Sequence, residues 1–189
     1  MDGHHLAQNL TFVGDKIGYS PAFIATQPRA IELGGKEIVV MEKEVSLAFD
    51  FIASLTDAQR KDALKDERRG RIVAGAGKDG VRPDSRGLDL STLTDDQRTI
   101  LLNLIRVWVG DLPEKQADAR MKEVAAQLDE CRFAWRGPFG PKGSDASYHL
   151  YGPGLILEFG GQDLGGDPAE HLHSIYRDPT NEYGARWIK

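Results

Sequence analysis

The strongest constraint on the fold is a change in the spacing of apolar residues along the chain. Residues 1–41 and 131–189 have the short, alternating apolar pattern that is typical of β-strands. Residues 42–130 repeat their apolar positions every three to four residues, as amphipathic helices do. Because strands and helices are segregated rather than alternating, we predict an α+β fold with a mainly antiparallel sheet. An N-terminal hairpin and a C-terminal β-meander would form this sheet, and an inserted cluster of about three helices would pack on one side.

Local signals indicate where these elements begin and end. Gly14-Asp15 is a two-residue turn pair between two β-prone segments, which predicts a hairpin. Thr56 and Thr94 are each followed three residues later by Gln, the capping-box pattern that begins a helix. A further helix is expected over residues 113–130. The chain has 189 residues, so one domain can contain all of these elements.

The segment between the two capping boxes, residues 68–88, is rich in Gly and Arg. Phosphate-binding loops are also rich in Gly. A Walker A motif requires a Gly five residues before the Gly of the Gly-Lys pair, and a Ser or Thr after the Lys. Ile72 and Asp79 occupy these two positions. We therefore expect a long surface loop with solvated arginines, and no nucleotide cofactor.

The composition restricts the partners and the compartment. The net charge of −5 argues against nucleic acid or an anionic membrane as the main partner, because phosphate binding needs a basic surface. No apolar run approaches the roughly 18 residues of a membrane span, and the first residues lack the pattern of a signal peptide. We therefore expect a cytoplasmic protein. The single cysteine, Cys131, excludes an internal disulfide and is expected to be a small buried hydrophobe.

Polar residues in apolar strand segments indicate a candidate functional site. His171 and His173 are two residues apart, so on a strand both rings lie on the same face and could bind one metal ion. Glu158 interrupts an apolar segment, where a carboxylate is costly to bury unless it is paired, hydrogen-bonded or metal-bound. His4 would be a fourth ligand or a general base, and Arg177 would orient an anionic substrate group. This set suits zinc, iron or manganese, and the composition does not choose among them.

Each of these assignments has a packing alternative. A histidine on an apolar face is more often a core residue than a ligand, and Glu158 could instead pair with Arg132, Arg136 or Arg177. His5 and His149 are weaker candidates. The leading hypothesis is a metal-dependent enzyme, hydrolytic or oxidative, that acts on a small molecule. The alternatives are a non-catalytic metal- or ligand-binding module and a structural subunit whose histidines are packed.

Five segments occur in order over nearly the whole chain: "GHHLAQNLTFVGDKIGYSPAFIATQP", "LTDDQRTILLNLIRVWVG", "CRFAWRGP", "YHLYGPGLILEF" and "HLHSIYRDPTNEYG". Together they resemble the bacterial family of domain of unknown function 3500. The resemblance implies that His4, Glu158, His171 and His173 belong to the pattern of that family. It does not imply a particular reaction.

Members of that family usually carry a segment before the first strand, whereas this chain begins two residues ahead of Gly3-His4. The chain would then be a short or N-terminally truncated member. We therefore expect the first strand to have an exposed edge, which invites pairing with another chain. The protein would be a homodimer, or a partner chain would cover this strand.

Overall fold

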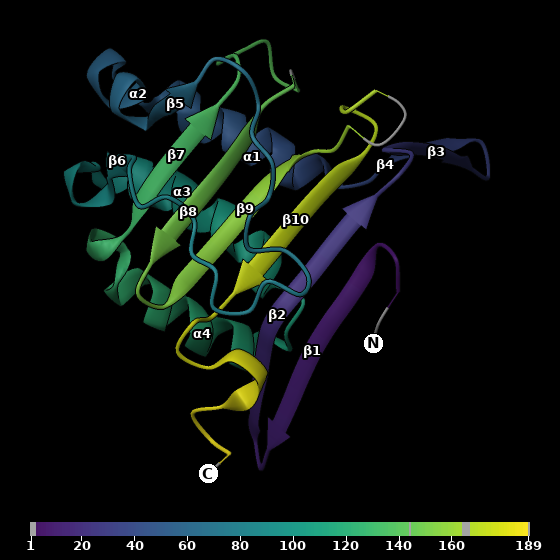
Figure 1. The fold of residues 1–189 in the computed structure, drawn as a ribbon, viewed down its shortest axis with the longest axis vertical. Coiled ribbons are helices and arrows are strands. Elements are labelled where there is room, and N and C mark those ends of the chain that lie inside the picture. Colours follow the sequence, from purple (N-terminus) through teal and green to yellow (C-terminus); the bar gives the residue numbers. More distant parts are fainter. Residues whose placement is uncertain (1–2, 144, 164–166, 189) are drawn as a thin grey trace.

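The fold is built around one eight-stranded sheet (Figure 1). Seven strands follow the order β1-β2-β10-β9-β8-β7-β5, and the eighth, β6, also pairs with β7. The computed structural model describes residues 3–143, 145–163 and 167–188. The strands are β1 (Leu6–Val13), β2 (Lys16–Thr26), β5 (Leu64–Asp66), β6 (Leu88–Asp89), β7 (Arg132–Arg136), β8 (Ser147–Gly152), β9 (Leu155–Gly161) and β10 (Leu172–Arg177). Among the described residues of this sheet, only β5 and β7 pair in parallel. The predicted α+β class and mainly antiparallel sheet are confirmed.

The described part of the chain has four α-helices, all between the N-terminal and C-terminal strands. They are α1 (Glu42–Ser54), α2 (Asp57–Ala63), α3 (Asp95–Val109) and α4 (Glu114–Ala126), and the short 3₁₀ helices are η1 (Leu90–Thr92), η2 (Leu128–Glu130) and η3 (Glu182–Gly184). Complete capping boxes at Thr56 and Thr94 begin α2 and α3, as predicted. The helix count exceeds the expected three because the capping box at Thr56 begins a separate short helix directly after α1.

The hydrophobic core lies between the sheet and the helices α1, α3 and α4, which cover one face of the sheet (Figure 1). The apolar stripe of α1 meets the aromatic residues of β7. Phe51 contacts Phe133 edge to face at 4.9 Å between ring centroids, and Phe49 contacts Trp135 in the same way at 5.0 Å. Cys131 is part of this core, where burial raises the pKa of its thiol to about 11. It is the small hydrophobe that the sequence predicted.

The predicted N-terminal hairpin is present, and β1 is the edge strand of the sheet. Val13 pairs with Lys16 across the turn, and Gly14 has the positive φ of 60° that such a turn requires. The exposed apolar side chains of β1 include Phe12, at 67% of its full exposure. Pairing of this edge with a second chain stays a prediction. A separate two-stranded sheet, β3 (Ala30–Leu33) with β4 (Lys36–Val39), projects beyond the main sheet (Figure 1).

Among the described residues, no helix combines the length and the apolar character that crossing a membrane would require.

The Gly- and Arg-rich segment, residues 67–87, crosses the face of the sheet opposite the helices (Figure 1). It is held there by a buried carboxylate and a buried guanidinium. Glu158 on β9 accepts hydrogen bonds from the backbone N–H groups of Val73, at 3.1 Å, and Ala74, at 2.7 Å. Arg177 at the end of β10 donates to the carbonyl oxygens of Ala74, at 2.8 Å, and Gly75, at 3.0 Å. Two side chains of the sheet thus clamp one short stretch of loop backbone.

This clamp corrects part of the expectation of a solvated surface loop. Arg71 and Arg82 are exposed, as expected. The side chain of Arg69 is only 12% exposed, because it forms ion pairs with Asp145 and Asp163. The loop is therefore an ordered cover of the sheet rather than a solvated connection.

Replacing Glu158 by Gln should loosen the loop, because a neutral amide offers one acceptor oxygen where the carboxylate uses two. Hydrogen bonds to a charged group contribute about 1.5–3 kcal/mol each. Trypsin should therefore cut after Arg71 or Lys78 at least roughly tenfold faster than in the parent protein, since 1.4 kcal/mol corresponds to a factor of ten. Mass spectrometry of a time course measures this rate. Glu37→Gln, at an exposed carboxylate of β4, is the matched control, and equal cleavage of both variants would contradict the clamp.

Candidate metal centre

Three histidines from opposite ends of the chain converge above the sheet. His5 directly precedes β1, His171 directly precedes β10, and His173 lies within β10. The Nε2 atoms of His171 and His173 are 2.8 Å apart, and those of His171 and His5 are 3.2 Å apart. One ring nitrogen from each residue lies within 4.8 Å of the other two. A single ion could therefore contact all three rings.

The strand register leaves room for this convergence. β2 separates β1 from β10, and the residue of β2 that pairs with His173 is Ala25. The N–H of Ala25 also donates to the carbonyl oxygen of His5 at 2.8 Å, so these three residues form one row across the sheet. On its other side His173 pairs with Gly160 of β9. Because neither neighbour has a side chain longer than a methyl group, the imidazole rings can meet over β2.

The surroundings of His5 and His173 favour neutral imidazole rings. Burial lowers the pKa of His173 to about 4, and the neighbouring His171, His5 and His4 act in the same direction. Burial also lowers the pKa of His5, together with the repulsion from His4 and His171. A neutral ring has the lone pair that a metal ion needs. Nδ1 of His171 is buried and has no hydrogen-bond partner among the described residues, so this ring acts through Nε2.

The family model described as "Protein of unknown function (DUF3500)" matches residues 1–185. The chain belongs to the DUF3500 family. The resemblance found in the sequence is therefore confirmed over essentially the whole chain. No curated protein and no solved structure matches the chain. The assignment of a site in this DUF3500 protein consequently depends on its own geometry.

The structure brings together two of the four predicted ligands, His171 and His173, and adds His5, which the sequence ranked lower. His4 lies outside the convergence point, exposed, with its ring stacked on that of His5 at 4.5 Å between centroids. The carboxylate of Glu158 is on the same side of the sheet but binds the loop amides. Burial raises its pKa, although the amides of the loop and Arg177 act in the opposite direction. The geometry thus gives Glu158 a different partner from the expected metal.

Arg177, the predicted clamp for an anionic substrate, is 1% exposed and is occupied by protein groups. Besides the loop carbonyl oxygens it contacts Asp79 at 3.0 Å and Glu182 at 2.7 Å. A catalytic role for His4 or Arg177 in this DUF3500 protein stays a prediction. His149, the other weak candidate, is buried, and its Nε2 lies 2.9 Å from the carbonyl oxygen of Asp84 in the loop.

Both the alternation along the first strand and the resemblance to the family favoured His4 over His5. Counting alternate residues places His4 on the apolar face with Leu6, and His5 on the other face. His5 lies in a bend just before β1, and its carbonyl oxygen accepts from Ala25, which fixes its position against β2. The sequence contains one usable signal, the pair His4-His5 itself, because either of two adjacent histidines at the start of a strand is a candidate for the same site.

The lowered pKa of His173 predicts how the stability of the metal-free protein depends on pH. Between about pH 6.5 and 4, the unfolded chain binds a proton at His173 that the folded chain does not bind. The free energy of unfolding should therefore fall as the pH drops through this window. In His173→Gln this contribution is absent, so its stability should decline less steeply. Urea unfolding in chelator at several pH values measures the difference.

The matched control for this prediction is His4→Gln, because His4 is exposed and lies at the rim of the same cluster. Its stability should stay close to the parent curve, because His4 is the weakest of the influences that lower the pKa of His173. A His173→Gln curve parallel to that of the parent protein across the window would contradict the prediction.

Proposed function

We propose that this protein binds one divalent metal ion through His5, His171 and His173, and that the bound metal serves hydrolytic or oxidative chemistry on a small molecule. The observation that carries the proposal is that one ring nitrogen from each of the three histidines lies within 4.8 Å of the other two. With Zn–N bonds of about 2.0–2.1 Å, the nitrogens of a tetrahedral site lie about 3.3–3.4 Å apart. The distances of 3.2 and 2.8 Å between the Nε2 atoms are close to this spacing. Small ring movements would complete the site.

The donor set favours zinc or iron over manganese. All three donors are imidazole nitrogens, which suit zinc, copper, iron and nickel, whereas manganese prefers oxygen ligands. With Glu158 bonded to the loop, no carboxylate belongs to the group formed by the described residues. We therefore expect zinc to bind more tightly than manganese.

Three protein ligands leave a fourth coordination position for water or substrate, which is the arrangement of catalytic rather than structural zinc sites. His171 is buried, while His5 and His173 are only partly buried, so the site is open on the side of the two outer rings. A zinc ion in such a site lowers the pKa of bound water to about 7 and polarises carbonyl groups. The exposed ring of His4, which stacks on His5, would exchange a proton with a bound substrate.

A hydrogen-bonded histidine cluster without metal is the competing interpretation. The short contacts between Nε2 atoms also suit a chain of hydrogen bonds, in which one ring donates to the next. In that case the histidines would stabilise the junction of the two chain ends and would bind no ion. Metal titration separates the two interpretations.

Calorimetric titration of untagged, chelator-treated protein should show one zinc ion bound per chain, iron(II) bound under anaerobic conditions, and manganese bound more weakly. Replacing His5, His171 or His173 by Ala should weaken zinc binding at least a hundredfold, because two imidazole ligands alone hold the ion poorly. Glu158→Gln, His149→Ala and His4→Ala should keep stoichiometric binding. Far-ultraviolet circular dichroism of each variant verifies that its helices remain folded.

Absence of zinc and iron uptake by the parent protein would end the metal proposal and the enzyme hypothesis with it. Loss of binding in Glu158→Gln with an intact fold would restore Glu158 as a ligand.

A further inference from the structure

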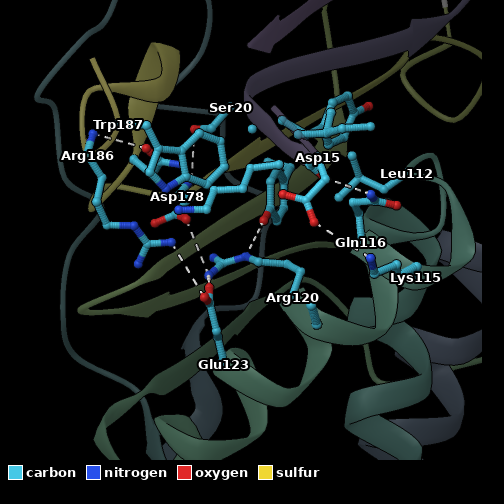
Figure 2. Close-up of a pocket in the computed structure, with 17 residues that line it drawn as sticks. Asp15, Ser20, Leu112, Lys115, Gln116, Arg120, Glu123, Asp178, Arg186 and Trp187 are labelled. Atoms are coloured by element: carbon cyan, nitrogen blue, oxygen red, sulfur yellow. Dashed lines mark hydrogen bonds and ion pairs between the residues drawn. The ribbon is translucent and has the colours of Figure 1, made fainter. Parts of the chain in front are cut away.

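A second candidate site lies at the other end of β10, away from the histidines. A cavity of about 570 Å³ opens between the first half of β2, helix α4 and the segment that follows β10. Figure 2 shows Trp187 and Arg186 on one side of it, Leu112 and Gln116 on the other, and Arg120 extending from α4. Binding sites for small molecules have volumes of about 300–1,000 Å³, so this cavity is large enough for one.

Aromatic rings supply the apolar wall of the cavity. Tyr19 and Tyr176 line it with stacked rings, 5.7 Å between centroids. Their hydroxyl groups are already engaged, since Tyr19 donates to Asp111 at 2.8 Å and Tyr176 accepts from Arg120 at 2.7 Å. The two side chains are 5% and 1% exposed, so they close the cavity wall and leave no free hydroxyl in it. The half-buried ring of Trp187 adds a further aromatic surface.

The cavity also has a cation that the protein leaves unneutralised. Arg120 forms ion pairs with both Glu123 and Asp178. Lys115 pairs with Asp15, at 3.7 Å between Nζ and Oδ2. Lys16 has no carboxylate partner among the described residues. Its Nζ instead lies 5.9 Å from the ring centre of Trp187, at the cavity. A positive charge beside an aromatic wall suits a ligand that carries a negative charge on a flat apolar body.

A buried amide adds directional recognition. Asn181 is 4% exposed, and its Oδ1 accepts from the backbone N–H of Arg186 at 3.1 Å. Nδ2 has no acceptor among the described residues, and it is not a fully enclosed atom, so it can donate into the cavity. Gly18 lies beside it, and a Cβ at this position would come within 3.1 Å of Trp187. The glycine thus lets the indole ring and the amide pack closely over β2 at the edge of the cavity.

We propose that this cavity binds a small aromatic carboxylate. The ring of the ligand packs against Trp187 and the two tyrosines, and its carboxylate accepts hydrogen bonds from Lys16 Nζ and Asn181 Nδ2. This site is independent of the metal centre, because its residues lie at the opposite end of β10.

The test uses 2-naphthoate as a probe and the indole N–H signals in ¹H–¹⁵N NMR spectra as the reporter. The chain has three tryptophans, and Trp108 and Trp135 are buried at 3% and 1% exposure, so they serve as internal references. We expect a saturable shift of the Trp187 signal, assigned with Trp187→Phe. The neutral analogue 2-naphthylmethanol should bind at least tenfold more weakly.

Two variants probe the basis of this recognition. Lys16→Gln should weaken naphthoate binding about tenfold and remove the preference over the neutral analogue. Lys36→Gln, at an exposed lysine of β4, is the matched control and should bind like the parent. His173→Ala should also keep full binding, so failure of the metal proposal would leave this result unaffected.

Three outcomes would overturn the proposal. They are no saturable shift at millimolar 2-naphthoate, equal binding of the acid and the alcohol, and shifts of similar size at all three indole signals.

Discussion

The antiparallel pairing of β2 with β10 is the contact on which both candidate sites depend. It joins the N-terminal hairpin to the C-terminal strands and so brings together residues that are more than 140 positions apart in the sequence. Its register places Ala25 beside His173, and thereby His5 beside His171. A slip of one residue would turn His173 towards the core and would separate the three histidines. The same strand pair places Tyr19 against Tyr176 at the other end.

The two faces of the sheet are stabilised by different interactions, apolar packing on one and hydrogen bonds to buried charges on the other. The helix face is a conventional apolar core, with aromatic rings of α1 packed against those of β7. The opposite face carries Glu158 and Arg177, and burying such charges is costly unless hydrogen bonds satisfy them. The loop satisfies them with its own backbone, since its amides bind the carboxylate and its carbonyl oxygens bind the guanidinium. A Gly-rich sequence suits this role, because it lets backbone groups approach the sheet closely.

Much of the fold was predictable, because its signals are local. The turn at Gly14-Asp15, the capping boxes at Thr56 and Thr94 and the apolar stripes of the helices each depend on neighbouring residues. Their segregation along the chain was sufficient to predict an α+β fold. The pairing of His171 with His173 was predictable for the same reason, since strand geometry relates residues two positions apart.

The rest of the site depends on contacts between distant segments. His5 rather than His4 lies at the site because the bend before β1 is bonded to β2. A local sequence pattern does not predict this contact. The partner of Glu158 is loop backbone, and a sequence of side chains does not show where backbone N–H groups will point. The apolar context of Glu158 indicated that its carboxylate, if buried, would need a partner. The identity of that partner, the loop backbone, was not predictable from the sequence.

Diffraction from crystals soaked in zinc, recorded on both sides of the zinc absorption edge, tests the central claim most directly. The account predicts one anomalous peak per chain, about 2.0–2.1 Å from Nε2 of His5, His171 and His173, with the fourth position occupied by solvent. Glu158 should remain on the amides of Val73 and Ala74. A crystal soaked with excess zinc that shows no anomalous peak at the three histidines, or shows the ion bound only elsewhere, would contradict it.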